Sequence, residues 1–332
     1  MSKDTVYVVI LNWNGWQDTV ICLEHLFKSQ GCRFVAVVCD NGSTNDSLQH
    51  IEAWLREKSG AFQKKELAYR LVARTEVDAR RCAQTGSPVD LVLIDNAENL
   101  GFAGGCNVGI RYALQQDDCA HVWLLNNDTV VPPDSMAAMV NAFKSRPSLG
   151  LCGSQVRYLE QPELVQSFGG LLNKWFCTTH TLSCGLPASQ LVSEPANIDF
   201  VPGASMMASR DFLESVGLMY EKYFLYFEEI DWAERAKGKF QIGVCLDSLV
   251  YHAGGASIGS PGEAGQRGLR SEYYLLRGRL MFAKRFYPHR LWSVYLGLLA
   301  SVGTRLRKKQ WDRAGIALRV VLGQVPKNLV RT

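Results

Sequence analysis

Apolar positions follow two alternating patterns along the first half of the chain. Continuous apolar runs, typical of strands buried on both faces, are followed by segments with apolar residues at helical spacing. Strands are predicted at 5–13, 33–40, 89–96, 119–128 and 149–156, and helices at 15–31, from Asp46 or Ser47 onward, at 99–114 and at 132–147, the last with proline at its start. This alternation predicts a mostly parallel, Rossmann-like α/β sheet flanked by helices on both faces.

The remaining segments are less regular. Residues 56–88 are polar and mixed, which predicts an insertion or long loop, and the Gly/Ser-rich stretch 253–265 predicts a flexible loop. A strand is predicted at 241–252, and from about residue 267 the pattern is helical and basic. We therefore expect an α/β domain over 1–260 and a C-terminal helical, basic extension over 261–332.

Charge is distributed unevenly along the 332 residues, which carry a formal net charge of +4. From Tyr273 to the end there are thirteen Lys or Arg and one acid, so this tail carries +12 and the rest of the chain −8. Such asymmetry predicts contact with an anionic partner. Basic helices that carry Trp292, Tyr295 and Trp311 favour an anionic membrane surface, with packing or a homodimer as the alternative. The acidic body and the lack of a nucleic-acid-binding motif argue against nucleic acid.

Cysteine usage and the absence of targeting signals favour a cytoplasmic protein. The ten cysteines are scattered without a C-x-x-C pair, and Cys22, Cys39 and Cys245 lie in apolar runs, so we expect reduced core residues. The first residues predict a strand rather than a signal peptide. No apolar stretch reaches the roughly 18–20 residues that a spanning helix needs.

Polar side chains cluster where the predicted strands end. They are Asp40 after the second strand, Asn99 in a glycine-rich segment after the third, and Asn126, Asn127 and Asp128 after the fourth. Ligands of parallel sheets bind beyond the carboxyl ends of the strands, so these side chains are candidates for one site. Asn126 and Asp128 offer two oxygens at close spacing, the ligand type that Mg²⁺ or Mn²⁺ prefers. Each cluster alone is equally typical of a turn or a helix cap.

A group of acids follows the aromatic run at 220–227. Glu228, Glu229 and Asp231 place three carboxylates within four residues. Crowded carboxylates in apolar surroundings raise one another's pKa, as a general base working near neutrality requires. The alternative is a solvated first turn of a helix. His252, at the end of the strand 241–252, is either structural or a metal ligand.

Taken in order, these motifs closely resemble the family 2 glycosyltransferases of GT-A fold, and most of all the bacterial rhamnosyltransferase-like branch that builds polysaccharides on lipid carriers. The resemblance covers residues 5–255 and rests on VILNWNG, CDNGSTNDS, NLGFAGGCNVG, LLNNDT, VPGASMMASRDFLESVG, YFEEIDWAER and VYH. It implies a GT-A sheet, a nucleotide-sugar donor, and Mg²⁺ or Mn²⁺ as cofactor.

The resemblance also implies a role for each candidate residue. Glu229 would be the catalytic base, with Glu228 as the alternative proton acceptor and Asp231 as a supporting acid. Asp128 would be the main charged metal ligand, because Asn126 stands where the family has the first acid of its D-x-D motif, and His252 would add a metal or diphosphate contact. The residues implied for the nucleotide-sugar pocket are Asn12, Asn14, Asp40, Asn99, Gly101, Gly104, Gly105, Asn126, Asn127, Gly203 and Ala204.

The implied reaction is a single inverting displacement at the anomeric carbon by a hydroxyl of a saccharide acceptor. The resemblance favours dTDP-L-rhamnose as donor, with UDP-sugars next, and a lipid-linked acceptor at the inner face of the cell membrane. A sugar nucleotidyltransferase is disfavoured, because NWNGWQD at 12–18 has one glycine and no base. A catalytically inactive sugar-nucleotide-binding module remains the alternative of another class, against which the retained acids argue.

Overall fold

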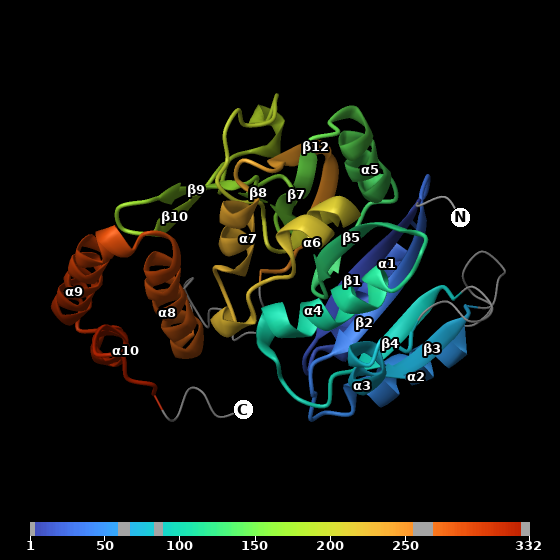
Figure 1. Cartoon of the computed structure of the whole chain (residues 1–332), viewed down its shortest axis with the longest axis horizontal. Coiled ribbons are helices and arrows are strands. Elements are labelled where there is room, and N and C mark those ends of the chain that lie inside the picture. Colours follow the sequence, from blue (N-terminus) through green and yellow to red (C-terminus); the bar gives the residue numbers. More distant parts are fainter. Residues whose placement is uncertain (1–3, 59–66, 83–88, 255–267, 327–332) are drawn as a thin grey trace.

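The computed structural model describes residues 4–58, 67–82, 89–254 and 268–326 (Figure 1). A ten-stranded sheet forms its centre in the order β3-β4-β2-β1-β5-β11-β7-β12-β6, with β8 paired to β7, and β9 and β10 form a separate pair. The strands are β1 (Thr5–Asn12), β2 (Arg33–Asp40), β3 (Tyr69–Ala73), β4 (Leu91–Asp95), β5 (Cys119–Asn126), β6 (Thr129–Val130), β7 (Leu149–Tyr158), β8 (Val165–Ser167), β9 (Gly170–Asn173), β10 (Thr178–Thr181), β11 (Ser205–Ser209) and β12 (Gln241–His252).

Helices cover both faces of the sheet (Figure 1). Helices α1, α2 and α5 pack on one face, and α3, α4, α6 and α7 on the other. Three more, α8 to α10, lie at one end of the molecule. The α-helices are α1 (Trp16–Leu26), α2 (Ser47–Lys58), α3 (Arg74–Asp78), α4 (Gly101–Leu114), α5 (Ser135–Ser145), α6 (Arg210–Val216), α7 (Glu228–Ala236), α8 (Leu269–Phe286), α9 (Leu291–Arg307) and α10 (Trp311–Val321).

The continuous apolar strands are buried on both sides, as their pattern predicted. In β1, Tyr7 and Val9 enter the core under α4, whereas Val6 and Val8 enter the core under α1. This division follows from the two-residue period of a strand. Strands β1, β2, β4 and β5 pair in parallel, so their carboxyl ends meet at one edge. The mostly parallel sheet is confirmed, with β6, β8 and β11 as antiparallel members.

Two local predictions were wrong. The segment expected to be an insertion or loop contains β3 and α3; β3 pairs in parallel with β4 but buries only Val72 fully, so its apolar pattern is weak. Helix α5 begins at Ser135 rather than at the prolines, because the Ser135 N–H bonds to the Pro132 carbonyl in a turn before the helix. The predicted loop 253–265 lies outside the described residues from 255 onward.

The C-terminal helices are confirmed, and they share a core with α7. Tyr273, Phe282 and Val294 pack in one hydrophobic cluster with Phe227 and Ile230. The close approach extends to the backbone of α8, where a Cβ on Gly278 would lie 2.9 Å from the Phe227 ring. The extension therefore supports the helix that carries the acidic cluster. Within the described residues, no helix is both long and apolar enough to cross a bilayer.

Candidate active site

Strand register brings the polar strand ends together. Asn12 at the end of β1 is level with Asp40 on β2, and Asp40 is level with Asp95 on β4. On the other side of β1, Leu11 is level with Asn126 of β5. The antiparallel β11 begins at this edge, so the Ala204 carbonyl accepts a hydrogen bond of 3.0 Å from the Asn126 N–H. Residues from five chain segments thus form one continuous polar edge.

At one end of this edge, Asp40 fixes two loops. Its Oδ1 accepts hydrogen bonds of 2.6 Å from both the Asn12 amide and the Ser43 hydroxyl, and its Oδ2 accepts one of 3.0 Å from the Ser43 N–H. Asn14, in the left-handed region at φ 55°, donates its N–H to Ser43 Oγ and accepts the Thr44 N–H at its side chain. The loops after β1 and β2 are therefore held in one arrangement before any ligand arrives.

The glycines at the start of α4 allow close packing against neighbouring segments. Gly101 has φ 74°, and a Cβ there would lie 2.5 Å from the Phe224 carbonyl oxygen. A Cβ on Gly105 would lie 2.4 Å from Leu11, and one on Gly104 would lie 2.8 Å from the Cβ of Leu100. The glycines thus let α4 approach β1 and the aromatic run closely; their contact with a sugar stays a prediction.

Asn99 and Gly203 have different surroundings, one closely packed and the other open. The Asn99 side-chain oxygen accepts hydrogen bonds from the Gly101 N–H at 3.0 Å and from the Asn41 amide at 3.1 Å, so it anchors the start of α4. Around Gly203, by contrast, a Cβ would meet nothing within 4 Å. Of the four predicted pocket glycines, Gly203 is the one that faces open space.

The metal candidates lie together. Asp128 Oδ1 is 3.1 Å from His252 Nε2, and the Asn126 amide nitrogen is also 3.1 Å from that ring nitrogen. The other ring nitrogen, Nδ1, is 2.6 Å from the side-chain oxygen of Gln166, which fixes the orientation of the ring. Asn127 points elsewhere, since its amide donates to the Gly15 carbonyl and Thr19 hydroxyl at the start of α1.

The donor set fits a divalent cation held together with a ligand. A carboxylate and an imidazole whose far nitrogen is oriented by a neighbour form a common arrangement of metal ligands. Among the described residues, no group of three or more His, Cys, Asp or Glu side chains is arranged to hold a metal ion by itself. Mg²⁺ and related ions are commonly bound by one or two carboxylates plus substrate phosphates.

The acids at the start of α7 lie in a different environment. Glu228 is only 3 % exposed and its Oε2 has no hydrogen-bond partner. Burial raises the pKa of Glu228 to about 8, helped by repulsion from Glu229, and burial raises the pKa of Glu229 to about 7. The solvated-turn alternative is therefore wrong for Glu228. Near neutrality the pair binds and releases protons, which is the requirement for a general base.

Strained backbone precedes these acids. Phe224, Tyr226 and Phe227 have φ values of 68°, 67° and 75°, the left-handed region that bulky residues rarely adopt. The surroundings hold them there: the Phe224 carbonyl accepts the Phe102 N–H at 2.6 Å, and the Phe227 carbonyl accepts the Asp231 N–H at 2.8 Å. Such strain persists only where packing imposes it, and it is frequent at active sites.

Asp231 has a supporting position. Its side chain is fully buried and accepts from Arg235 at 2.7 Å and from Tyr223 at 3.2 Å, and Arg285 of α8 lies 3.1 Å from Oδ2. Arg235 also donates to the Val216 and Leu218 carbonyls. Both carboxylate oxygens are therefore engaged in fixing α7 to its neighbours, which suits a positioning residue better than a proton acceptor.

Sequence reasoning missed several residues at this edge. Arg270, in the first turn of α8, lies with its guanidinium carbon 5.4 Å from the Trp13 ring centroid and 5.7 Å from that of Phe224. Gln166 orients His252. Burial together with the charge of Asp128 raises the pKa of Asp18. Each acts on a residue far away in the chain, so no spacing pattern marks it.

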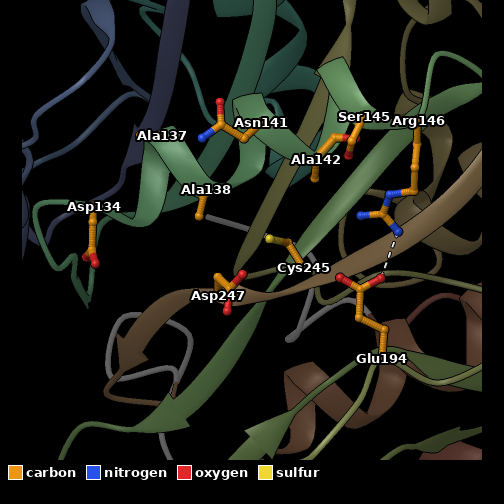
Figure 2. A pocket seen from close by; sticks show the side chains of 10 residues that line it. All are labelled: Asp134, Ala137, Ala138, Asn141, Ala142, Ser145, Arg146, Glu194, Cys245 and Asp247. Atoms are coloured by element: carbon orange, nitrogen blue, oxygen red, sulfur yellow. Dashed lines mark hydrogen bonds and ion pairs between the residues drawn. The ribbon is translucent and has the colours of Figure 1, made fainter.

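A cavity of about 650 Å³ lies apart from these residues, between α5 and β12 (Figure 2). Across it, Arg146 donates to Glu194 at 2.7 Å. Its lining comes from Asp134, Ala137, Ala138, Asn141, Ala142, Ser145, Arg146, Glu194, Cys245 and Asp247. None of the residues predicted for the site lines this cavity.

Known proteins similar to this chain are sugar transferases. The family model described as glycosyl transferase family 2 matches residues 73–216. The low-salt glycan biosynthesis hexosyltransferase Agl10 of Haloferax volcanii is 29 % identical over 164 residues, which is 47 % of this chain and 50 % of that protein. The chain thus matches about half the length of this relative.

Solved structures share the fold. The mannosyltransferase PcManGT of Pyrobaculum calidifontis, in complex with GDP-Man and Mn²⁺, matches with a TM-score of 0.54 and 15 % identity, covering 99 % of this chain and 78 % of that one. TarS 1-349 of S. aureus matches with a TM-score of 0.51 and 14 % identity, over 96 % and 81 % of the chains. GalNAc-T7, in complex with UDP, GalNAc and Mn²⁺, matches with a TM-score of 0.56 and 12 % identity. This match covers 85 % of this chain and 48 % of that one.

Proposed function

We propose that this chain, which has the GT-A fold and matches the family 2 glycosyltransferase model over residues 73–216, moves a sugar from a nucleoside diphosphate to a hydroxyl of a saccharide acceptor. The observation that carries this proposal is the buried pair Glu228 and Glu229, whose pKa values are raised to about 8 and about 7 at the edge of a strained loop. A carboxylate that accepts a proton near neutrality is what activation of a sugar hydroxyl needs.

Glu229 takes the role of the base. It is less deeply buried than Glu228, so an acceptor hydroxyl can reach it. In the reaction the acceptor oxygen forms a bond to the anomeric carbon while the bond from that carbon to the diphosphate oxygen breaks. The hydroxyl proton passes to Glu229, and the bonding electrons leave with the diphosphate. A single displacement of this kind inverts the anomeric centre, with no covalent enzyme intermediate.

Glu228 and Asp231 support the base in different ways. Repulsion between the two glutamates makes ionisation of both unfavourable, so the pair shares protons near neutrality. Asp231, tied to Arg235 and Arg285, holds the first turn of α7 in place.

The carboxyl edge of the sheet binds the donor. The preformed loops around Asp40 and Asn14 receive the nucleoside, and the open space at Gly203 receives the sugar. Arg270, which lies over the rings of Trp13 and Phe224, places a positive charge between the nucleoside loops and the acidic segment, where it attracts the diphosphate. The remaining candidates, Asn12, Asn99, Gly101, Gly104 and Gly105, keep these loops in place.

Asp128 and His252, with Asn126 beside them, would hold Mg²⁺ or Mn²⁺. Such an ion, when bound, offsets negative charge on a leaving diphosphate. Gln166 keeps the His252 ring oriented towards Asp128. Two of the structural relatives described above were solved with Mn²⁺, which supports a divalent ion here.

For the donor we propose dTDP-L-rhamnose first and a UDP-sugar second, on the resemblance of the ordered motifs to the rhamnosyltransferase-like branch. The relatives named above are described with other sugars, namely GDP-Man and UDP with GalNAc. The description of Agl10 as a glycan biosynthesis hexosyltransferase supports a saccharide product. A lipid-linked acceptor is part of the same proposal.

The proposal is tested by incubating dTDP-rhamnose, UDP-glucose, UDP-galactose, UDP-GlcNAc and GDP-mannose with Mg²⁺ or Mn²⁺ and measuring release of the nucleoside diphosphate. We expect slow hydrolysis of one donor by the wild type and none by Glu229→Gln. Thermal-shift binding of the same panel is the companion measurement. Binding of a donor without turnover, even with acceptor extracts, would favour the inactive binding module, and the absence of all binding would overturn both readings.

A further inference from the structure

The second and third helices of the C-terminal extension carry apolar side chains that no part of the described chain covers. On α9, Trp292, Leu296, Leu299 and Leu306 are all exposed, Trp292 to 60 %. Their spacing of four, three and seven residues places them on one face of the helix. The opposite face, with Val294 and Leu298, is buried against the rest of the extension. An apolar stripe four turns long therefore faces outward.

Helix α10 repeats the arrangement. Trp311, 66 % exposed, is followed at helical spacing by Leu318 and Leu322, and both leucines are exposed. Its buried face, with Ile316 and Val320, packs in the same core cluster as α9. Each helix thus has two apolar faces, one packed in the core and the other exposed to solvent.

The hairpin β9–β10 extends the stripe of α9. Trp175 and Phe176, at its turn, are exposed, and the Trp175 ring lies 6.4 Å from the Trp292 ring in an edge arrangement. The Ser293 hydroxyl donates to the Trp175 carbonyl at 2.5 Å, which fixes the hairpin on the first turn of α9. Figure 1 shows the hairpin and α9 at the same end of the molecule. We call the exposed apolar residues of this hairpin, α9 and α10 the docking surface.

Basic residues border the docking surface. Arg307, Lys308 and Lys309 are exposed at the turn between α9 and α10, and Arg319 is exposed on α10. Over residues 287–326 the sequence has seven Lys or Arg and a single acid, Asp312. Two of these arginines, Arg305 and Arg313, are paired with Glu272 of α8 inside the extension.

We propose that the docking surface binds the anionic headgroup layer of a lipid bilayer and inserts its tryptophans and leucines at the interface. Helices with an apolar stripe, terminal tryptophans and flanking Lys or Arg lie in the plane of such interfaces. Charge decides against a second copy of this chain as the occupant. A symmetric dimer would bring together two surfaces whose borders carry the same positive charge, whereas anionic headgroups complement that charge.

The test is flotation of the full-length protein with vesicles of phosphatidylcholine alone and of phosphatidylcholine with one quarter phosphatidylglycerol. We expect binding to the anionic vesicles and weak binding to the neutral ones, with binding falling as salt is raised from about 50 to 500 mM. The double variant Leu296→Gln/Leu299→Gln is expected to lose roughly tenfold or more in partitioning, because apolar area no longer leaves water. Lys308→Gln/Lys309→Gln is expected to lose about fivefold per charge.

A matched control uses exposed apolar residues elsewhere. Val192→Gln, at a site 84 % exposed, and Leu71→Gln should bind vesicles as the wild type does. All variants should keep the melting temperature of the wild type, which shows that they fold. Wild-type failure to float with anionic vesicles, or flotation unchanged by the leucine variants, would overturn the proposal. A lipid-free dimer seen by light scattering that the leucine variants dissociate, with no vesicle binding, would identify a second copy as the occupant.

Discussion

The carboxyl edge of the sheet and the acidic start of α7 deal with polar groups in opposite ways. At the edge, Asp40 accepts three short hydrogen bonds, and the loops around it are fixed to each other. At α7, Glu228 is buried with an unpartnered oxygen, behind three aromatic residues in left-handed backbone. One region satisfies its polar groups in advance, and the other keeps a desolvated acid pair under strain.

Under the proposed function, this difference would separate donor binding from proton transfer. A hydrogen-bonded network of fixed geometry costs little further entropy when a donor binds. An acid kept out of water has its pKa moved towards neutrality, which makes it a base but destabilises the fold when it ionises. The buried Asp231, paired with Arg235 and Arg285, holds the same helix in place. The predictions below test whether the two regions divide the work in this way.

The largest expected effect is on turnover. Glu229→Gln should lower the rate of nucleoside diphosphate release about 10²–10⁴-fold, because the base is lost while its shape is kept. Donor binding, measured by calorimetry, should change little. Glu228→Gln is the matched variant, with a smaller loss of rate. If the two variants exchange these effects, the proton goes to Glu228.

The next effect is on stability. Asp231→Asn should lower the free energy of unfolding by about 1.5–3 kcal/mol in urea titrations, because the fully buried Asp231 loses its charge-assisted hydrogen bonds to the half-buried Arg235 and the exposed Arg285. The control is Arg56→Gln, which removes an exposed i, i+4 pair with Glu52 and should leave the unfolding midpoint unchanged. Equal midpoints for Asp231→Asn and the wild type would show that α7 does not depend on this pair.

The next effect concerns binding of the nucleoside diphosphate at the carboxyl edge of the sheet, where we propose a metal ion. Asp128→Asn should weaken Mn²⁺-dependent binding of the nucleoside diphosphate by about 100-fold, and Gln166→Leu by about tenfold through a less ordered His252. Calorimetry with and without a chelator measures both. A chelator that leaves binding of the wild type unchanged would contradict a metal at Asp128.

The acid pair should also appear in the pH dependence of stability. Because the folded-state pKa of Glu228 is raised from 4.5 to about 8, the folded protein binds more protons than the unfolded chain between these values. Its contribution to the free energy of unfolding therefore falls as pH rises through this window, by up to about 1.4 kcal/mol per pH unit. Glu228→Gln should remove the effect, so its stability relative to the wild type should increase from pH 5 to pH 8. A difference that does not vary with pH would mean that Glu228 ionises normally.

The smallest effect is expected at the boundary between the regions. Arg270→Met should weaken donor binding about tenfold, because a charge-assisted contact to the diphosphate is lost. Arg270→Lys keeps the charge but not the guanidinium, which lies over the Trp13 and Phe224 rings and can bind a phosphate through two N–H groups, so it should recover only part of the affinity. Unchanged affinity in both variants would assign Arg270 to packing alone.

Sequence reasoning succeeded where local pattern carries the information. Apolar runs located β1, β2, β4, β5 and β7, because strands buried on both faces have continuous apolar sequences. The strand β12 was also predicted, although only part of it is buried. Sequence reasoning failed at β3, whose exposed positions hide the strand, and at the start of α5, where a turn precedes the helix. The sequence pattern also located the polar residues at the strand ends, but not the distant residues that contact them.

The sequence by itself determined that polar residues end the strands, that acids begin α7, and that the tail is helical and basic, since period and composition are local properties. Only the tertiary structure decided that Gln166 orients His252, that Arg270 of α8 lies over the Trp13 ring, and that Gly105 packs on Leu11. These contacts join residues distant in the chain. They depend on strand order and on where each crossover helix returns, which no local pattern encodes.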